Sequence, residues 1–331
     1  MAKKSVENPN IKMLLGDVFS KVEDDKIKKY RSKWRENPIK HIIEKFPIHL
    51  DVESTSICNL KCKFCAGTYE KYSYGFIPLE LYKRIVDEGS DKGLYSIKLN
   101  FRGEPLLHPQ IDTLVAYAKK KGIIDVFFNT NATLLTGDIC KKLIDSGLDR
   151  LIISFEGVSK STYETTRVGA SFEKVVDNVR RFYGLREKLN SIRPLIRLQT
   201  VDIKQAKDYL QSYKIFWEKY ADEITCIDQR DEICDYSQMR SDTWECPYPW
   251  RRLCITWDGN VLTCPFVTKS ENKYIRQELG TLKEESIEHI WLGQAMQNIR
   301  ENHLNKTSYK IEPCKYCSFR GAEILKLREN K

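Results

Sequence analysis

The strand-like stretch Pro47-Ile-His-Leu-Asp-Val-Glu53 and the loop behind it, Ser56-Ile-Cys-Asn-Leu-Lys-Cys-Lys-Phe-Cys65, decide the fold. The loop carries three cysteines, Cys58, Cys62 and Cys65. A closed structural zinc site and an ordinary four-iron cluster each use four protein ligands. Three ligands on one loop therefore predict a [4Fe-4S] cluster with one iron open to another ligand. A zinc loop that borrows a distant fourth ligand is the alternative.

The cysteines as a whole indicate a reducing compartment. The chain has 331 residues and 11 cysteines, an odd number, and its N-terminus lacks the apolar core of a secretion signal. No window approaches the roughly 18 apolar residues of a membrane-spanning helix. We therefore expect a cytoplasmic protein without a membrane span, in which thiols bind metal instead of forming disulfides.

Residues 1–45 predict a basic, helical N-terminal extension. They contain twelve Lys and Arg and seven Asp and Glu, in a chain of net charge +9. Ile27, Tyr30 and Trp34 have helical spacing, and a second short helix is predicted after a break at Asn37-Pro38. The charge is typical of a solvated helix face, and attraction of an anionic substrate or partner is the alternative. We expect no nucleic-acid partner, because no aromatic-and-basic module is present.

Strand-like runs alternate with helix-like runs from residue 47 onward, which is typical of βα units around a parallel sheet. The predicted strands are 47–53, 94–100, 123–128, 150–154, 195–201 and 223–228, and the predicted helices are 79–89, 110–121, 137–146, 171–189 and 204–219. Eight strands would close a full barrel. The predicted fold class is therefore α/β, with a partial (βα)6 TIM-like barrel that binds its ligands at the C-terminal strand ends.

The Cys-x3-Cys-x2-Cys spacing, with Phe64 before the last cysteine, resembles the radical S-adenosylmethionine (radical SAM) superfamily. The resemblance implies that residues 46–235 form the barrel and that the methionine end of SAM binds the open iron. It further implies that the reduced cluster cleaves SAM to a 5′-deoxyadenosyl radical, which abstracts hydrogen from a substrate. A flavodoxin- or ferredoxin-type electron donor is implied as a partner.

Residues at or just beyond successive strand ends resemble the SAM contacts of this family. Phe101-Arg-Gly-Glu-Pro105 is similar to the Gly-Gly-Glu-Pro segment that holds the SAM amino group, with Arg102 replacing the first glycine. Ser154-Phe-Glu156-Gly157 is similar to Ser-x-Asp-Gly, with Glu156 replacing Asp. The implied cofactor-binding residues are Phe64, Gly103, Glu104, Asn129, Asn131, Ser154, Arg167 and Gln199. Ordinary turns at 103–105 and 129–131, and a surface ion pair for Arg167, are the alternatives.

A second cysteine group follows the barrel. It consists of Cys246, of Cys264 beyond a predicted turn at Asp258-Gly259-Asn260, and of the knuckle formed by Cys314 and Cys317. Four thiolates suit either zinc or a cubane cluster. The run resembles the SPASM/twitch extension of radical SAM enzymes, which implies an α+β domain over residues 236–331. No cysteine follows Cys317, so the resemblance implies one auxiliary [4Fe-4S] cluster.

Four cysteines lie outside both groups. Cys140 and Cys254 are interpreted as packing residues, Cys254 also as a spare thiol. Cys226 and Cys234 lie near the predicted barrel mouth, where a thiol can give a hydrogen atom to a substrate radical, and packing in the core is the alternative for both. Candidates for substrate contact there are Asp228, Gln229 and Arg230.

The resemblance implies an enzyme with one auxiliary electron acceptor. The leading prediction is oxidation of a secondary alcohol on a small molecule such as a sugar or cyclitol. Epimerisation or crosslinking of a peptide or protein is the alternative reaction. A non-catalytic iron-sulfur or zinc protein is the alternative from another class. It gives no reason for Glu104, Ser154 and Arg167 to follow successive strands.

Overall fold

The computed structural model describes residues 3–4, 11–16, 24–202, 209–228, 239–240, 244–265, 268–270 and 273–329. Gln229, Arg230 and Cys234 lie outside these residues, as does the side chain of Asp228. Among the helices of the described part, none is long and apolar enough to cross a membrane.

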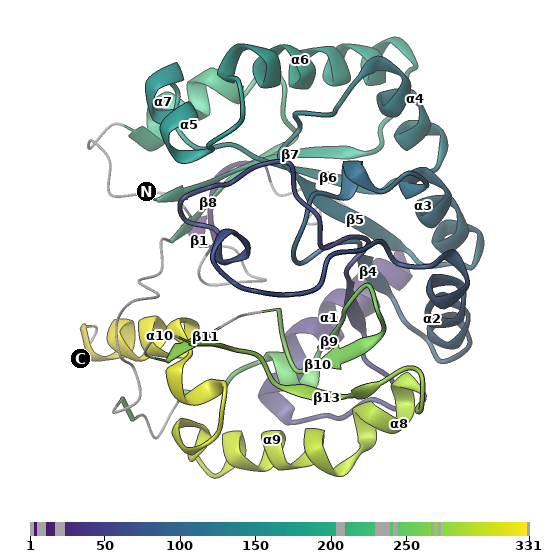
Figure 1. The fold of residues 1–331 in the computed structure, drawn as a ribbon, viewed down its shortest axis with the longest axis vertical. Coiled ribbons are helices and arrows are strands. Elements are labelled where there is room, and N and C mark those ends of the chain that lie inside the picture. Colours follow the sequence, from purple (N-terminus) through teal and green to yellow (C-terminus); the bar gives the residue numbers. More distant parts are fainter. Residues whose placement is uncertain are drawn as a thin grey trace.

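Six parallel strands form the curved sheet at the centre of the molecule (Figure 1). The strands are β3 (His49–Val52), β4 (Ser96–Lys98), β5 (Asp125–Thr130), β6 (Arg150–Ser154), β7 (Leu195–Asp202) and β8 (Glu223–Asp228). The helices between them are α2 (Leu79–Asp91), α3 (Ile111–Lys120), α4 (Gly137–Asp145), α5 (Lys160–Thr166), α6 (Phe172–Lys188) and α7 (Tyr209–Trp217). The predicted partial barrel is confirmed.

The two faces of this sheet differ in character. Every second residue packs into the apolar core beneath the helices, among them Leu50, Ile97, Val126, Leu151, Ile196 and Ile224. The alternate residues face the concave side and form a belt of buried charges. Arg150 donates twice to Asp125, at 2.8 and 2.6 Å, and Arg197 donates to Glu223 at 2.6 Å. The inside of the barrel is therefore polar.

The sequence predicts a helical N-terminal segment, but the structure also contains two strands there. Strand β1 (Lys3–Lys4) pairs with β2 (Ile11–Leu15), which pairs antiparallel with β8 and extends the sheet. Helix α1 (Asp25–Lys40) runs through Pro38. The predicted break was therefore wrong. Proline removes one backbone donor, and the helix ends within one turn, at the left-handed His41.

Helix α1 packs against the N-terminal ends of the strands. The Trp34 ring meets the His49 ring edge-on at 5.6 Å, and the Tyr30 ring stacks on Tyr95 at 5.6 Å. His49 opens β3, and Tyr95 directly precedes β4. The helix thus covers the bottom of the barrel and leaves ligands to enter at the other end.

The C-terminal domain continues the same sheet. Strand β9 (Arg252–Ile255) lies parallel to β3, and a hairpin through Gly259, at φ +90°, joins it to β10 (Asn260–Leu262). The remaining elements are β11 (Thr268–Ser270), β12 (Lys273–Ile275), β13 (Glu278–Thr281), α8 (Ile287–Leu292), α9 (Gln294–Leu304) and α10 (Ser318–Glu329). The predicted hairpin and α+β domain are confirmed. The main-chain pairing with the barrel was not predicted.

Candidate functional site

The three-cysteine loop leaves the C-terminal end of β3 and returns to α2. Cys58 and Cys65 are exposed, whereas Cys62 is buried. The backbone N–H of Cys65 donates to the Cys62 carbonyl at 3.1 Å, and that of Lys63 donates to Thr166 at 3.1 Å. Burial raises the pKa of Cys62 to about 11. The loop is thus held by its own backbone and by the α5 region, and a bound metal would have to stabilise the thiolates.

Glu104 is buried at the top of the barrel, beside this loop. Its carboxylate accepts hydrogen bonds from the Thr130 hydroxyl and the Asn131 N–H, both at 2.7 Å. The Asn131 amide donates to Asn59 of the cysteine loop at 2.9 Å. Gly103 has φ +67°, and a Cβ there would lie 2.1 Å from the Thr55 carbonyl. The Gly-Glu-Pro segment is therefore held closely against the cysteine loop, and its contact with SAM stays a prediction.

Arg167 forms a buried ion pair with Glu156, not a surface pair. Its Nε and Nη2 both donate to the Glu156 carboxylate, and Nη1 lies 3.9 Å from Cys62 Sγ. The guanidinium is also 5.5 Å from the centre of the Phe64 ring. Glu156 thus holds the Arg167 guanidinium beside Cys62 of the cysteine loop. Only Nη1 remains directed towards the expected SAM cluster.

The structure brings the predicted strand-end residues to one side of the barrel. Asn129, Ser154 and Gln199 are half-buried, and Ser154 and Gln199 are register partners on β6 and β7. Cys226 is not brought there. Its side chain is 0% exposed, and its register partner is Thr200, whose hydroxyl bonds Tyr209 of α7. Cys226 therefore lies on the helix side, which makes it unsuitable as a hydrogen donor to substrate.

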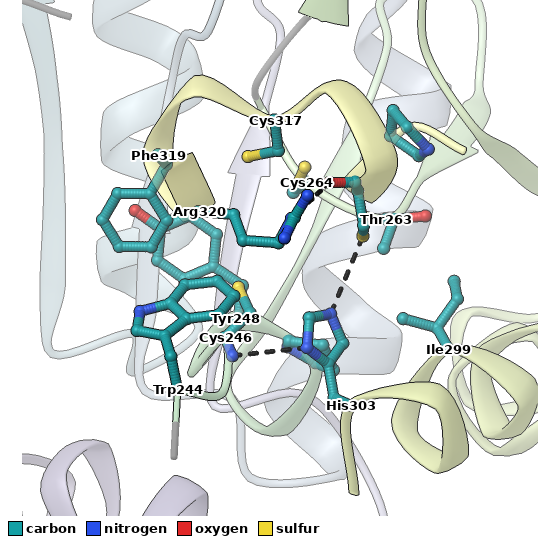
Figure 2. A pocket seen from close by; sticks show the side chains of 13 residues that line it. Trp244, Cys246, Tyr248, Thr263, Cys264, Ile299, His303, Cys317, Phe319 and Arg320 are labelled. Carbon is teal, nitrogen blue, oxygen red and sulfur yellow. Dashed lines mark hydrogen bonds between the residues drawn. The ribbon is translucent and has the colours of Figure 1, made fainter. Parts of the chain in front are cut away.

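The four C-terminal cysteines line one pocket (Figure 2). Cys246 precedes a short 3-10 turn (Tyr248–Trp250), Cys264 follows β10, and Cys314 begins a second 3-10 turn (Cys314–Tyr316) that Cys317 follows. Burial raises the pKa of Cys246 and of Cys314. No three His, Cys, Asp or Glu side chains in the described ranges converge as around one bound ion. The donor set, four thiols in a pocket walled by Trp244, Tyr248 and Phe319, fits a cluster.

Sequence reasoning missed His303 and Arg320 in this pocket. His303 Nε2 lies 3.7 Å from Cys314 Sγ, and Arg320 donates to the Cys314 carbonyl at 3.0 Å. The only local signal was a histidine on a helix, eleven residues before Cys314. Cys254 is not a wall of this pocket. It pairs in register with Asp51, so its side chain shares the concave face of the sheet.

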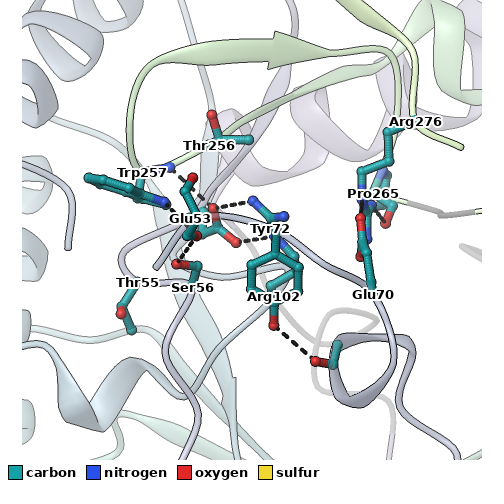
Figure 3. A network of polar contacts seen from close by, with 12 residues as sticks. Glu53, Thr55, Ser56, Glu70, Tyr72, Arg102, Thr256, Trp257, Pro265 and Arg276 are labelled. Carbon is teal, nitrogen blue, oxygen red and sulfur yellow. Dashed lines mark hydrogen bonds and ion pairs between the residues drawn. The ribbon is translucent and has the colours of Figure 1, made fainter. Parts of the chain in front are cut away.

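Arg102, which replaces a family glycine, joins the barrel to both cysteine regions (Figure 3). It donates to both oxygens of buried Glu53, at 2.6 and 2.9 Å, and lies 4.2 Å from the Tyr72 ring centre. The Trp257 N–H of the C-terminal hairpin donates to the same carboxylate at 3.2 Å. A Cβ on Gly75 would meet the Trp257 ring at 2.4 Å. Arg102 and Trp257 therefore bind the same Glu53 carboxylate, which joins the first cysteine loop region to the C-terminal hairpin at the end of β3.

A second ion pair connects the loops that carry the two cysteine groups. Arg276 donates to both oxygens of Glu70 at 2.7 Å, and its Nη1 donates to the Pro265 carbonyl at 3.1 Å. Glu70 follows Cys65 in the first loop, and Pro265 follows Cys264. The pair thus holds the first loop against the C-terminal domain.

Comparison with known proteins identifies the family. The radical SAM superfamily model matches residues 52–205, and the SPASM model, an iron-sulfur cluster-binding domain, matches residues 246–318. The chain therefore belongs to the radical SAM superfamily and is an enzyme of its SPASM type, with SAM and iron-sulfur clusters as cofactors.

Three relatives illustrate the range of similar proteins. The tungsten-containing aldehyde ferredoxin oxidoreductase cofactor-modifying protein of Pyrococcus furiosus is 22% identical over 318 residues, which cover 83% of this chain and 88% of that protein. BtrN in complex with AdoMet and 2-DOIA has a TM-score of 0.53 and 21% identity, over 83% of this chain and 94% of BtrN. Streptococcus suis SuiB bound to precursor peptide SuiA has a TM-score of 0.60 and 16% identity, over 89% of this chain and 74% of SuiB.

Breaking the Glu70–Arg276 pair is expected to loosen the first loop. Both side chains are largely buried, at 8% and 12% exposure, and removing one partner of such a pair costs about 3–5 kcal/mol. Arg276→Gln should therefore accelerate amide hydrogen exchange across residues 66–76, measured by mass spectrometry. Glu80→Gln, which breaks an ion pair to Lys83 at an 81% exposed carboxylate, is the control. Unchanged exchange in Arg276→Gln would contradict this role of the pair.

Proposed function

We propose that this radical SAM enzyme oxidises a secondary alcohol of a sugar, cyclitol or related metabolite to a ketone. Cys58, Cys62 and Cys65 would hold the cluster that binds SAM, and Cys246, Cys264, Cys314 and Cys317 the auxiliary cluster. When bound, SAM and its cluster would supply the radical that removes the carbinol hydrogen atom and becomes 5′-deoxyadenosine, and the auxiliary cluster would accept the electron that remains after the hydroxyl proton leaves. A flavodoxin- or ferredoxin-type donor would reduce the first cluster.

The proposed reaction needs a side chain that accepts the hydroxyl proton. The position of Lys98 inside the barrel is the observation that carries the proposal. Lys98 ends β4 and is the register partner of Asp51, so it shares the polar concave face. It is half-buried, and no hydrogen bond or ion pair of its amine occurs within the described part of the chain. Unlike Lys98, the neighbouring carboxylates are in ion pairs: Asp51 pairs with Arg252 at 2.9 Å, and Asp125 pairs with Arg150.

The surroundings of Lys98 shift its protonation equilibrium towards the neutral amine. Burial lowers the pKa of Lys98, the charge of Asp51 opposes this shift, and the charge of Arg252 adds to it. A neutral amine can accept a proton, and a general base works best when its pKa lies near the operating pH. Lys98 is also five residues from Gly103, on the strand that leads into the Gly-Glu-Pro segment. This position on β4 supports a role for Lys98 beside the expected SAM site.

The large share of BtrN that aligns with this chain supports a small-molecule substrate. The alignment covers 94% of BtrN, whose structure holds AdoMet and 2-DOIA, but 74% of SuiB with its peptide. The higher TM-score for SuiB, 0.60 against 0.53, favours a peptide substrate as the second candidate.

Deuterium transfer distinguishes the two functions. The reconstituted enzyme, SAM and dithionite are incubated anaerobically with cyclitols and sugars deuterated at their carbinol carbons, or with deuterated peptides. We expect deuterium in 5′-deoxyadenosine and a ketone product with the alcohols. Transfer from peptides alone would replace alcohol oxidation with peptide modification. Absence of SAM cleavage in every incubation would contradict both.

Replacing Lys98 is expected to separate SAM cleavage from product formation. Lys98→Arg keeps the positive charge but cannot accept a proton, so ketone formation should fall by about 10²–10⁴-fold. Formation of 5′-deoxyadenosine should continue. In the wild type, the ketone rate should fall as the pH drops through the lowered pKa of Lys98, because protonation removes the base. Lys83→Arg, at a half-buried position on α2 where the amine pairs with Glu80, is the control. Wild-type ketone yield in Lys98→Arg would contradict this role.

A further inference from the structure

His303 contacts two of the four cysteine residues in the auxiliary pocket (Figure 2). It lies on α9 and is 2% exposed. The backbone N–H of Cys246 donates to its Nδ1 at 3.4 Å, and its Nε2 lies 3.7 Å from Cys314 Sγ. One ring thus bridges the first and third cysteines of the group.

These two contacts fix which nitrogen carries the proton. A ring nitrogen that accepts a hydrogen bond from a backbone N–H carries no hydrogen itself. Nδ1 is therefore the acceptor, and the hydrogen of the imidazole is on Nε2. Since Nε2 faces Cys314 Sγ, the ring donates to sulfur.

We infer that His303 donates a hydrogen bond to Cys314 Sγ and raises the reduction potential of the auxiliary cluster. A donor to a ligand sulfur stabilises the cluster form with more negative charge, which is the reduced form. His303 would thereby help the cluster to accept an electron. The inference rests on the auxiliary cluster of the proposed function but not on the identity of the substrate.

The surroundings hold this donor in place. Arg300, one turn earlier on α9, donates from Nε to the Pro249 carbonyl at 3.0 Å and from Nη1 to the Trp291 carbonyl at 2.9 Å. The first bond ties the helix to the chain just after Cys246. On the other side, Arg320 donates to the carbonyls of Cys314 and Lys315, at 3.0 and 3.1 Å. Both ends of the His303 bridge are therefore anchored independently of the ring, and a change at position 303 should act mainly on the sulfur.

The test measures the potential of the auxiliary cluster alone. Changing Cys58, Cys62 and Cys65 to Ala leaves only the auxiliary ligands, and an EPR-monitored redox titration of the reconstituted protein gives the midpoint potential. His303→Asn can still accept from Cys246 through its amide oxygen but is too short to donate to Cys314. We expect its reduction equilibrium constant to fall about tenfold, a shift of about 59 mV to lower potential for one electron. His303→Gln reaches farther and should restore most of the shift.

His289→Asn in the same background is the matched control, because His289 lies on α8 with a side chain 72% exposed. It should leave the potential unchanged. A wild-type potential in iron-loaded His303→Asn would overturn the inference. So would loss of auxiliary iron from both His303 variants, or strong nitrogen hyperfine coupling to the cluster with His303 intact, since either means that the ring is itself a ligand or a structural requirement. If the protein with His303 intact binds zinc instead of iron, the proposed function fails.

Discussion

The parallel pairing of β9 with β3 is the constraint on which both cysteine sites depend. His49 to Val52 align with Arg252 to Ile255, so the barrel and the C-terminal domain share one hydrogen-bonded sheet. The first cysteine loop leaves one of these strands, and the hairpin that leads to Cys264 leaves the other. The Glu53–Arg102 and Glu70–Arg276 pairs then join the loops that follow. Main-chain hydrogen bonds therefore hold the two cysteine regions in a fixed relation to each other.

The polar interior of the barrel sets a second constraint. Parallel strands covered on both faces are usually apolar on both. Here the concave face carries Asp51, Asp125, Arg150, Arg197 and Glu223, each in an ion pair. Burying these charges is costly unless each is compensated, and a paired interior adds little stability over an apolar one. Asp125, Arg150 and Glu223 are the first residues of β5, β6 and β8, so these charges lie mainly at the bottom of the barrel, which α1 covers. Lys98 stands among these pairs without an ion pair of its own in the described residues.

The sequence predicted the elements well where a local pattern marks them. Alternating strands such as 150–154 and 195–201 agree with β6 and β7 within one residue, because a buried strand between turns is a local signal. The cysteine groups were found for the same reason. The pairings of β2 with β8 and of β9 with β3 were missed, since a short strand's partner is decided by tertiary contacts.

The parts of the site that the sequence did not reveal are long-range contacts of ordinary residues. His303 matters only because α9 brings it against Cys314, and Lys98 because its strand turns it inward. Cys226 was misjudged because a one-residue step along a strand moves a side chain to the other face. Arg102 could be identified as a departure from the family pattern, but its partner Glu53 could not.

Metal analysis of the two cysteine groups tests the central claim most directly. Iron, sulfide and zinc are counted per chain after anaerobic reconstitution of the wild type and of the variant with Cys58, Cys62 and Cys65 all changed to Ala. Two four-iron clusters predict about eight irons in the wild type and about four in the variant. A variant without iron, or with zinc at the auxiliary site, would contradict the account, because no second cluster would be present to accept the electron.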